Sequence, residues 1–280
     1  MNLLTRHPMR NKLLPFPADG WAVVLIVLTF AAQLSLYLFV DSIGWLAAGA
    51  FALVPFCLSV VAYNHNHMHV RTFSNQPLNR ILEVLIFLET GSSPFSGTLN
   101  HIVGHHASYD KPELDTLNWR RRDGTTMGRH EFALRCLAWH YPSCFVLGQK
   151  NPRLRAQFLT WLALGVALLG GLIAYRPVPA LIVFVAPMLL MLYALKWSAY
   201  AHHSGLPYGD DYTASRTHTG RFYNWFTWNA GYHAAHHFKQ ALHWSQLPEY
   251  HATLAPRIPA ELQGDGWGED LKRRSMTPAA

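Results

Sequence analysis

Residues 21–40 read WAVVLIVLTFAAQLSLYLFV, a run of twenty residues without a charged side chain. About twenty apolar residues in a helix cross the roughly 30 Å of hydrocarbon in a bilayer. Three similar runs follow, at residues 43–63, 156–175 and 178–195. Because such runs are too long for the strands of a membrane barrel, the sequence predicts four transmembrane helices, the last of them reaching about residue 199.

The composition of the chain agrees with a membrane protein. Of its 280 residues, 50% are hydrophobic and only 14% are charged, whereas soluble domains average about 25% charged residues. The formal net charge of +7 comes from basic residues that flank the apolar runs. This distribution favours contact with lipid headgroups or an acidic protein, and not with nucleic acid. The three cysteines form no CxxC pair, which argues against a disulfide framework or a zinc ribbon.

The connections between the apolar runs predict the topology. Asp41 and Ser42 join the first two runs, and Arg176 and Pro177 join the last two, so neither connection can hold much outside the membrane. Lys and Arg number three in residues 1–20, eleven in residues 64–155 and eight in residues 196–280, against Arg176 alone on the opposite side. Positive charge stays in the cytoplasm, so both termini and the polar segments are expected there.

The predicted fold is therefore an all-α, multi-pass integral membrane protein, with a single domain over residues 1–280. Its four transmembrane helices, at about 21–40, 43–63, 156–175 and 178–199, form two hairpins beneath a cytoplasmic helical cap. The cytoplasmic segments are residues 1–20, 64–155 and 200–280, and a mobile tail is expected over residues 264–280. Residues 78–90 and 132–148 are apolar but interrupted by charged or polar residues, which predicts helices at the membrane interface or shallowly re-entering it.

Histidines gather in four short segments of the cytoplasmic side. The chain has 17 histidines, and most lie in NHNHMH (residues 64–69), HIVGHH (101–106), AHH (201–203) and GYHAAHH (231–237). Positions i and i+4 share one face of a helix, so His65 and His69 should point the same way while His67 points elsewhere. His101 with His105, and His233 with His236 and His237, repeat such spacings, which let two or three ring nitrogens converge.

Four clusters on one side of the membrane indicate metal binding. Isolated histidines such as His130, His140 and His243 are instead interpreted as interfacial or hydrogen-bonded residues, and a haem site is disfavoured because the clustered histidines do not lie in mid-span. The clusters supply nine candidate histidines. One nitrogen from each is too many for a single metal ion, but nine nitrogens suit two ions. All-imidazole coordination is compatible with iron, copper or zinc, and the spacing alone does not choose among them. The nine candidates are His65, His69, His101, His105, His106, His202, His233, His236 and His237.

The segments HNHMH, HIVGHH and HAAHH resemble the three histidine boxes of the membrane fatty acid desaturase and hydroxylase superfamily. The resemblance covers most of the chain, and NAGYHAAHHFKQALHWSQLPEYHATL (residues 229–254) is especially similar to the region of the third box. Members often carry a further ligand just beyond the fourth helix, where SAYAHH places His202, with His203 as the alternative. Asn229 and Asp115 match polar positions near the boxes. Box one lacks the HExxH or HDxxH form of many relatives, and Ser198 stands where some desaturases have Asn.

The resemblance implies that the nine histidines bind two iron ions, with no catalytic residue beyond these ligands. It implies an oxidation, by dioxygen and two electrons, of an unactivated C–H bond in a fatty acyl or similar long apolar chain. The chain carries neither a haem-binding HPGG motif nor a cysteine set for an iron–sulfur cluster, so electrons should come from a separate ferredoxin, small cytochrome or reductase. Desaturation is the expected outcome; hydroxylation or oxidative decarboxylation is the alternative. A zinc-dependent membrane hydrolase is the alternative from another class.

Overall fold

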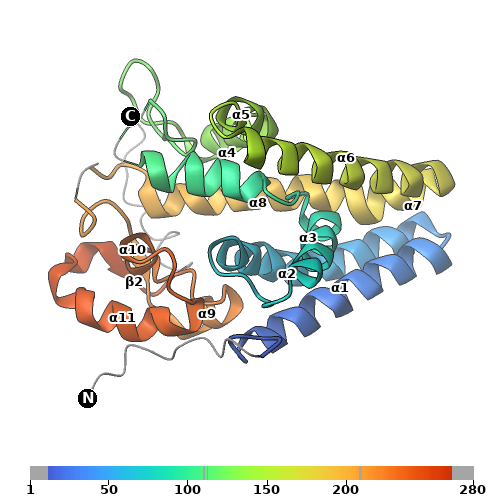
Figure 1. Cartoon of the computed structure of the whole chain (residues 1–280), viewed down its shortest axis with the longest axis horizontal. Coiled ribbons are helices and arrows are strands. Elements are labelled where there is room, and N and C mark those ends of the chain that lie inside the picture. Colours follow the sequence, from blue (N-terminus) through green and yellow to red (C-terminus); the bar gives the residue numbers. More distant parts are fainter. Residues whose placement is uncertain (1–11, 110, 112, 208–209, 267–280) are drawn as a thin grey trace.

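The computed structural model describes residues 12–109, 111, 113–207 and 210–266, and these are mostly helical. Four stretches are long and apolar enough to cross a membrane: α1 (Asp19–Phe39), α2 (Ile43–His69), α6 (Pro152–Tyr175), and residues 177–203, which comprise α7 (Pro177–Ala180), the π-helix η3 (Leu181–Val185) and α8 (Ala186–His203). They lie side by side and end together on the right of Figure 1.

The shorter elements other than α3 gather toward the other end of the long helices, and α3 lies beside them (Figure 1). The shorter elements are α3 (Gln76–Thr90), the π-helix η1 (Thr98–Val103), η2 (His106–Ser108), α4 (Arg129–Ala138), α5 (His140–Gly148), α9 (Arg221–Phe226), α10 (His233–Phe238), η4 (Trp244–Gln246), α11 (Leu247–Leu254), η5 (Ala255–Arg257) and η6 (Ala260–Leu262). Two short strands, β1 (Thr217–His218) and β2 (Gln263–Gly264), pair in parallel. Most of the tail expected to be mobile lies outside the described residues.

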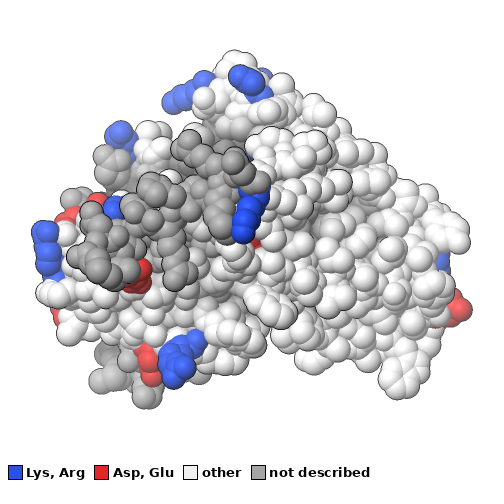
Figure 2. All heavy atoms as spheres, turned by 60° about the horizontal axis from the view of Figure 1, so that its bottom comes forward, with Lys and Arg blue, Asp and Glu red and all other residues white. Residues whose placement is uncertain are grey.

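The outer surface of the long helices is apolar. Trp21, Phe39, Trp45 and Phe51 each expose more than 70% of their surface. Figure 2 shows that Lys, Arg, Asp and Glu gather toward the end with the short helices, while the surface over the long helices carries almost none. Large exposed apolar patches are rare on soluble monomers and mark a contact surface. A bilayer around the long helices accounts for them.

Helix α3, expected at the membrane interface or shallowly re-entering it, packs against the long helices α1, α2, α6 and α8. Its residues Leu82 and Ile86 pack with α1 and α2, and Phe87 and Leu88 pack with residues of α1, α2 and α8. The charge of Glu83 is compatible with this position because Arg71, Arg80 and His67 contact its carboxylate. Burial raises the pKa of Glu83, but these partners together outweigh it, so the net pKa of this carboxyl is lowered.

Residues 132–148, expected as one helix, form parts of two. Helix α4 ends at Ala138 and α5 begins at His140, with Trp139 between them. The chain changes direction there, so α4 packs along α8 while α5 contacts α6 and η1.

A glycine allows α6 to approach α3. A Cβ atom at Gly165 would lie 2.7 Å from the Phe87 ring, whereas a Cβ at Gly170, one and a half turns further along α6, would meet no atom within 4 Å. Small residues at helix contacts in membranes permit such close packing.

We expect Gly165→Leu to lower the free energy of unfolding by about 1–3 kcal/mol, because the added side chain overpacks the contact with Phe87. Unfolding by SDS in mixed micelles measures this change. Gly170→Leu is the matched control and should cost nothing. Equal stability of the two variants would contradict the packing described.

Candidate metal centre

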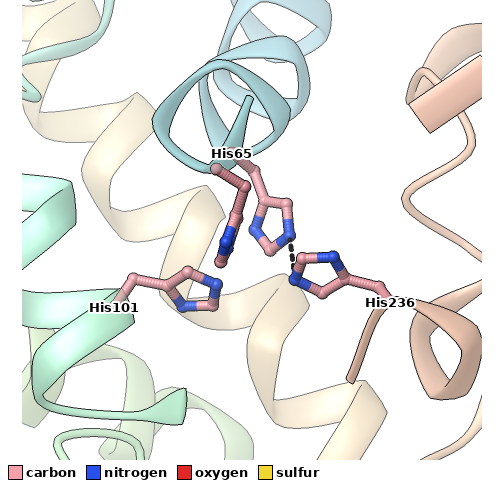
Figure 3. Close-up of side chains that lie close together, drawn as sticks. His65, His101 and His236 are labelled. Carbon is pink, nitrogen blue, oxygen red and sulfur yellow. Dashed lines mark hydrogen bonds between the residues drawn. The ribbon is translucent and has the colours of Figure 1, made fainter. Parts of the chain in front are cut away.

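Four segments far apart in the sequence bring their histidines to one place. The last turns of α2 carry His65 and His69, η1 carries His101, and His105 and His106 follow it. The end of α8 carries His202 and His203, and α10 carries His233, His236 and His237. Figure 3 shows His65, His101 and His236 pointing toward one another from three different segments. Helix α2 continues six residues beyond the predicted end of its span, and this extension positions His65 and His69.

The ring nitrogens form two groups. The first group has four histidines, each of which offers one ring nitrogen, and these nitrogens all lie within 4.8 Å of one another. Its members are His65, His69, His101 and His236. A second group with the same property contains His105, His203 and His237.

His106 and His233 each lie beside one of these groups. His106 Nε2 is 2.9 Å from His101 Nε2 and 3.0 Å from His236 Nε2. His233 Nε2 is 2.8 Å from His203 Nε2 and 3.2 Å from His237 Nε2. With these two residues the first group offers five imidazoles and the second offers four.

Hydrogen bonds among the rings cannot account for these contacts. Nε2 atoms of His101, His106, His236 and His65 form a chain with neighbouring distances of 2.9, 3.0 and 3.0 Å. A neutral ring nitrogen either donates or accepts, so no nitrogen in the chain can accept from one neighbour and donate to the next. The buried Nε2 atoms of His69 and His105 have no hydrogen-bond partner at all within the described residues.

A metal ion in each group would satisfy the nitrogens. Histidine nitrogens bind first-row metals at about 2.0–2.1 Å, so two ligands at right angles on one ion lie about 3 Å apart. The observed separations of 2.8–3.2 Å match this spacing. The residues therefore fit two closely spaced transition-metal ions.

The protonation state of the rings also suits metal binding. Burial, and then the charges of neighbouring rings, hold the pKa values of His101, His233, His236 and His237 well below the usual range. The rings are therefore neutral near pH 7, and neutral imidazole is the form that binds metals.

Contacts at Nδ1 fix the orientation of several rings. His105 Nδ1 is 2.8 Å from Asp115 Oδ1, which also accepts a hydrogen bond from the backbone of Leu117. His203 Nδ1 lies 3.2 Å from the carbonyl oxygen of Ala214. When Nδ1 carries the proton, the lone pair of Nε2 is directed to the metal position. Asp115, expected from the sequence to lie near the site, thus contacts it through His105.

Of the adjacent pair at the end of α8, the structure brings His203 and not His202 into the second group. The His202 ring stacks on that of His233, with centroids 4.1 Å apart and planes at 23°, and its Nδ1 lies 3.2 Å from the carbonyl oxygen of Arg216. Consecutive residues of a helix point about 100° apart, so only one of the two can face the group directly. The sequence expectation favoured His202, and the geometry favours His203.

Other histidines and Asn229 have separate contacts. His67 bonds to Thr72 and to Glu83, as expected for a residue facing away from His65. Asn229, which the sequence placed near the site, donates its side-chain amide to the carbonyl oxygen of Trp244. His243 contacts Asp19, whereas His140 is buried and both of its ring nitrogens lack a partner within the described residues.

A cavity of about 350 Å³ reaches the histidines. Its walls come mainly from α2, η1, α8 and residues 223–233, and they include His65, His101, His105 and His203. Many of the other lining residues are apolar, among them Leu58 and Val61. The volume and the apolar lining are typical of a small-molecule site.

We expect Asp115→Asn to weaken metal binding about 10- to 100-fold, because an amide holds the His105 tautomer less firmly than a carboxylate. Competition with a chelator, followed by metal analysis, measures the change. Asp123→Asn, in an exposed turn where Asp123 bonds to Thr125, is the control and should bind as the unchanged protein does. Equal metal retention in the two variants would exclude the proposed role of Asp115.

Comparison with known protein families identifies a match. The family model described as fatty acid desaturase matches residues 43–265. Searches of curated proteins and of solved structures found no match. The family match covers most of the chain and contains all four histidine clusters. The chain therefore belongs to the fatty acid desaturase family, and it is an oxidoreductase of lipid metabolism that resides in a membrane.

Proposed function

We propose that the protein oxidises an unactivated C–H bond of a fatty acyl or similar long apolar chain with dioxygen, at a centre of two iron ions, and that the product is an alkene. The observation that carries this proposal is the pair of adjacent imidazole groups beside an apolar cavity. A hydrolase with one zinc ion needs three protein ligands and an open position, and it would leave most of these nitrogens unused.

The proposed ligands fall into two sets. One ion would be held by His65, His69, His101, His106 and His236, and the other by His105, His203, His233 and His237. His202, stacked on His233, would support the second set or replace His203 in it. Imidazole ligands without thiolate suit iron, and the family favours iron over zinc or copper.

The bound ions would supply the activation of oxygen, since the removal of a hydrogen atom from a methylene is beyond side-chain acid–base chemistry. In the balanced reaction, two adjacent methylenes lose two hydrogen atoms, and dioxygen takes up these, two further electrons and two protons to give two water molecules. The two further electrons come from a separate donor such as a ferredoxin, a small cytochrome or a reductase. Oxygen transfer to carbon would instead give an alcohol, and loss of a terminal carboxylate would give a terminal alkene; these are the alternative outcomes.

The polypeptide would position the substrate and exclude water. Apolar residues of α2 and α8 would hold the acyl chain within the cavity, and the lipid around the long helices would deliver it. Asp115 would keep the lone pair of His105 directed to its ion.

The topology is part of the proposal. The four long helices would form two membrane hairpins of a single domain, and the short helices would form a cap on the cytoplasmic side. The excess of Lys and Arg in residues 64–155 and 196–280 supports this side, since positive charge stays in the cytoplasm. The metal centre and both termini would then be cytoplasmic.

We expect about two iron ions per chain in protein purified in mild detergent from iron-replete cells, and a loss of this iron in a His233→Ala, His236→Ala double variant. Mass spectrometry of metals measures the content. His130→Ala is the control, because His130 is exposed and bonds to Tyr193 away from the two groups. Lipid profiles should show an oxygen-dependent unsaturated product only in cells that express the protein with its iron.

Other outcomes would exclude the proposal. Zinc at one ion per chain under iron-replete expression would indicate hydrolysis. A hydroxylated product with two irons present would retain the centre and correct the reaction outcome.

A further inference from the structure

A lysine lies buried in the wall of the cavity. Lys196, on α8, exposes 3% of its surface and sits seven residues before His203. Its Nζ donates to Asn100 Oδ1 at 2.6 Å, and the described part of the chain holds no carboxylate in an ion pair with it. An ammonium has three donors, so two of them are left for a group that enters the cavity. Ionisable residues within membrane spans are costly and usually have a functional partner.

The orientation of Asn100 is fixed by a second contact. Its amide nitrogen donates to Ser143 Oγ at 2.7 Å, and Ser143 in turn donates to the carbonyl oxygen of His140 at 2.9 Å. Asn100 therefore presents its oxygen to Lys196, and it holds the ammonium at the cavity wall without neutralising the charge.

His140 lies in the wall of the same cavity. It exposes 2% of its surface, and neither ring nitrogen has a hydrogen-bond partner within the described residues. Burial, and then the charge of Lys196, hold the pKa of His140 well below its usual range, so the ring is neutral. Each unsatisfied buried polar group costs about 1–3 kcal/mol, so a ligand that satisfies these nitrogens would gain that free energy.

We propose that Lys196 and His140 bind the acyl carbonyl or carboxylate oxygens of the substrate. This inference rests on the proposed function and specifies the substrate's polar end. Seven residues of α helix span about 10 Å, so a chain held at Lys196 runs along the apolar wall toward His203. The carbons brought to the histidines are then those within about 10 Å of the polar end, not those at the distant methyl end of a long chain.

Thermal unfolding of the purified full-length protein in detergent tests this proposal. The probes are palmitic acid, methyl palmitate and hexadecane, which share chain length, with acetate as a short carboxylate. A ligand that binds the folded protein raises Tm by mass action. We expect palmitic acid or methyl palmitate to stabilise the protein more than hexadecane does, and acetate to have no effect. If palmitic acid raises Tm more than methyl palmitate does, the polar end of the substrate is a free carboxylate. If the two probes raise Tm equally, it is an esterified acyl group.

Variants locate the effect. Lys196→Met keeps the length of the side chain and should weaken binding of the oxygen-bearing probe about 10- to 100-fold, as expected for loss of a charged hydrogen bond. Lys150→Met, which changes an exposed lysine outside the cavity, should keep the preference. His140→Phe should reduce the preference severalfold, and it provides the test if Lys196→Met does not fold.

Three results would overturn the proposal. Equal shifts with hexadecane and palmitic acid would show that water alone occupies the polar wall. An equal shift with acetate would show a simple ion site. An unchanged preference in Lys196→Met, or in His140→Phe where the former does not fold, would place the polar end elsewhere. None of these readouts requires turnover, so a protein that lacks iron or oxidation activity can still show the preference, and an active oxidase can still fail to show it.

Discussion

The contact that organises the structure is the approach of imidazole nitrogens to about 3 Å from one another. Nine rings from four segments meet there, and their nitrogens cannot satisfy one another by hydrogen bonds alone. The surrounding fold holds them in place. Arg71, Arg80 and His67 fix Glu83 between α2 and α3, and Asp115 fixes His105. Without bound cations this arrangement would be costly, since buried polar atoms such as His69 Nε2 would have no partner.

The long helices could be predicted from the sequence because an uncharged run of twenty residues has few alternative structures in a membrane protein. Their ends could not be predicted as well. The apolar run stops at Tyr63, but α2 continues to His69, and there His65 meets His101 of η1 and His67 bonds to Glu83 of α3. The burial of charged residues on α3 could not be predicted, since such residues usually lie at a surface. Glu89 exposes none of its surface, and burial raises the pKa of its carboxyl well above the usual range.

The histidine spacing indicated which histidines would converge, but not how they divide between the two groups. His65 and His69, one helical turn apart, do converge in the first group. His101 and His105 have the same spacing, yet they enter different groups, because the π-helix η1 ends at Val103 and His105 lies beyond it. His236 and His237 are adjacent and also separate. The group that a histidine joins depends on where the chain leaves a helix and on contacts between distant segments. His203, which lies with His105 and His237, is an example. Local spacing encodes neither of these. From the sequence, His140 was only an isolated histidine and Lys196 was not singled out, because the contact of Lys196 with Asn100 joins segments far apart in the chain.

Two iron ions are proposed to occupy the two histidine groups. Anomalous diffraction from crystals of the iron-loaded protein, recorded on both sides of the iron absorption edge, tests this proposal most directly. We expect two iron peaks, one among His65, His69, His101 and His236 and one among His105, His203 and His237. A single peak, or an anomalous signal that appears only at the zinc edge, would contradict the proposal.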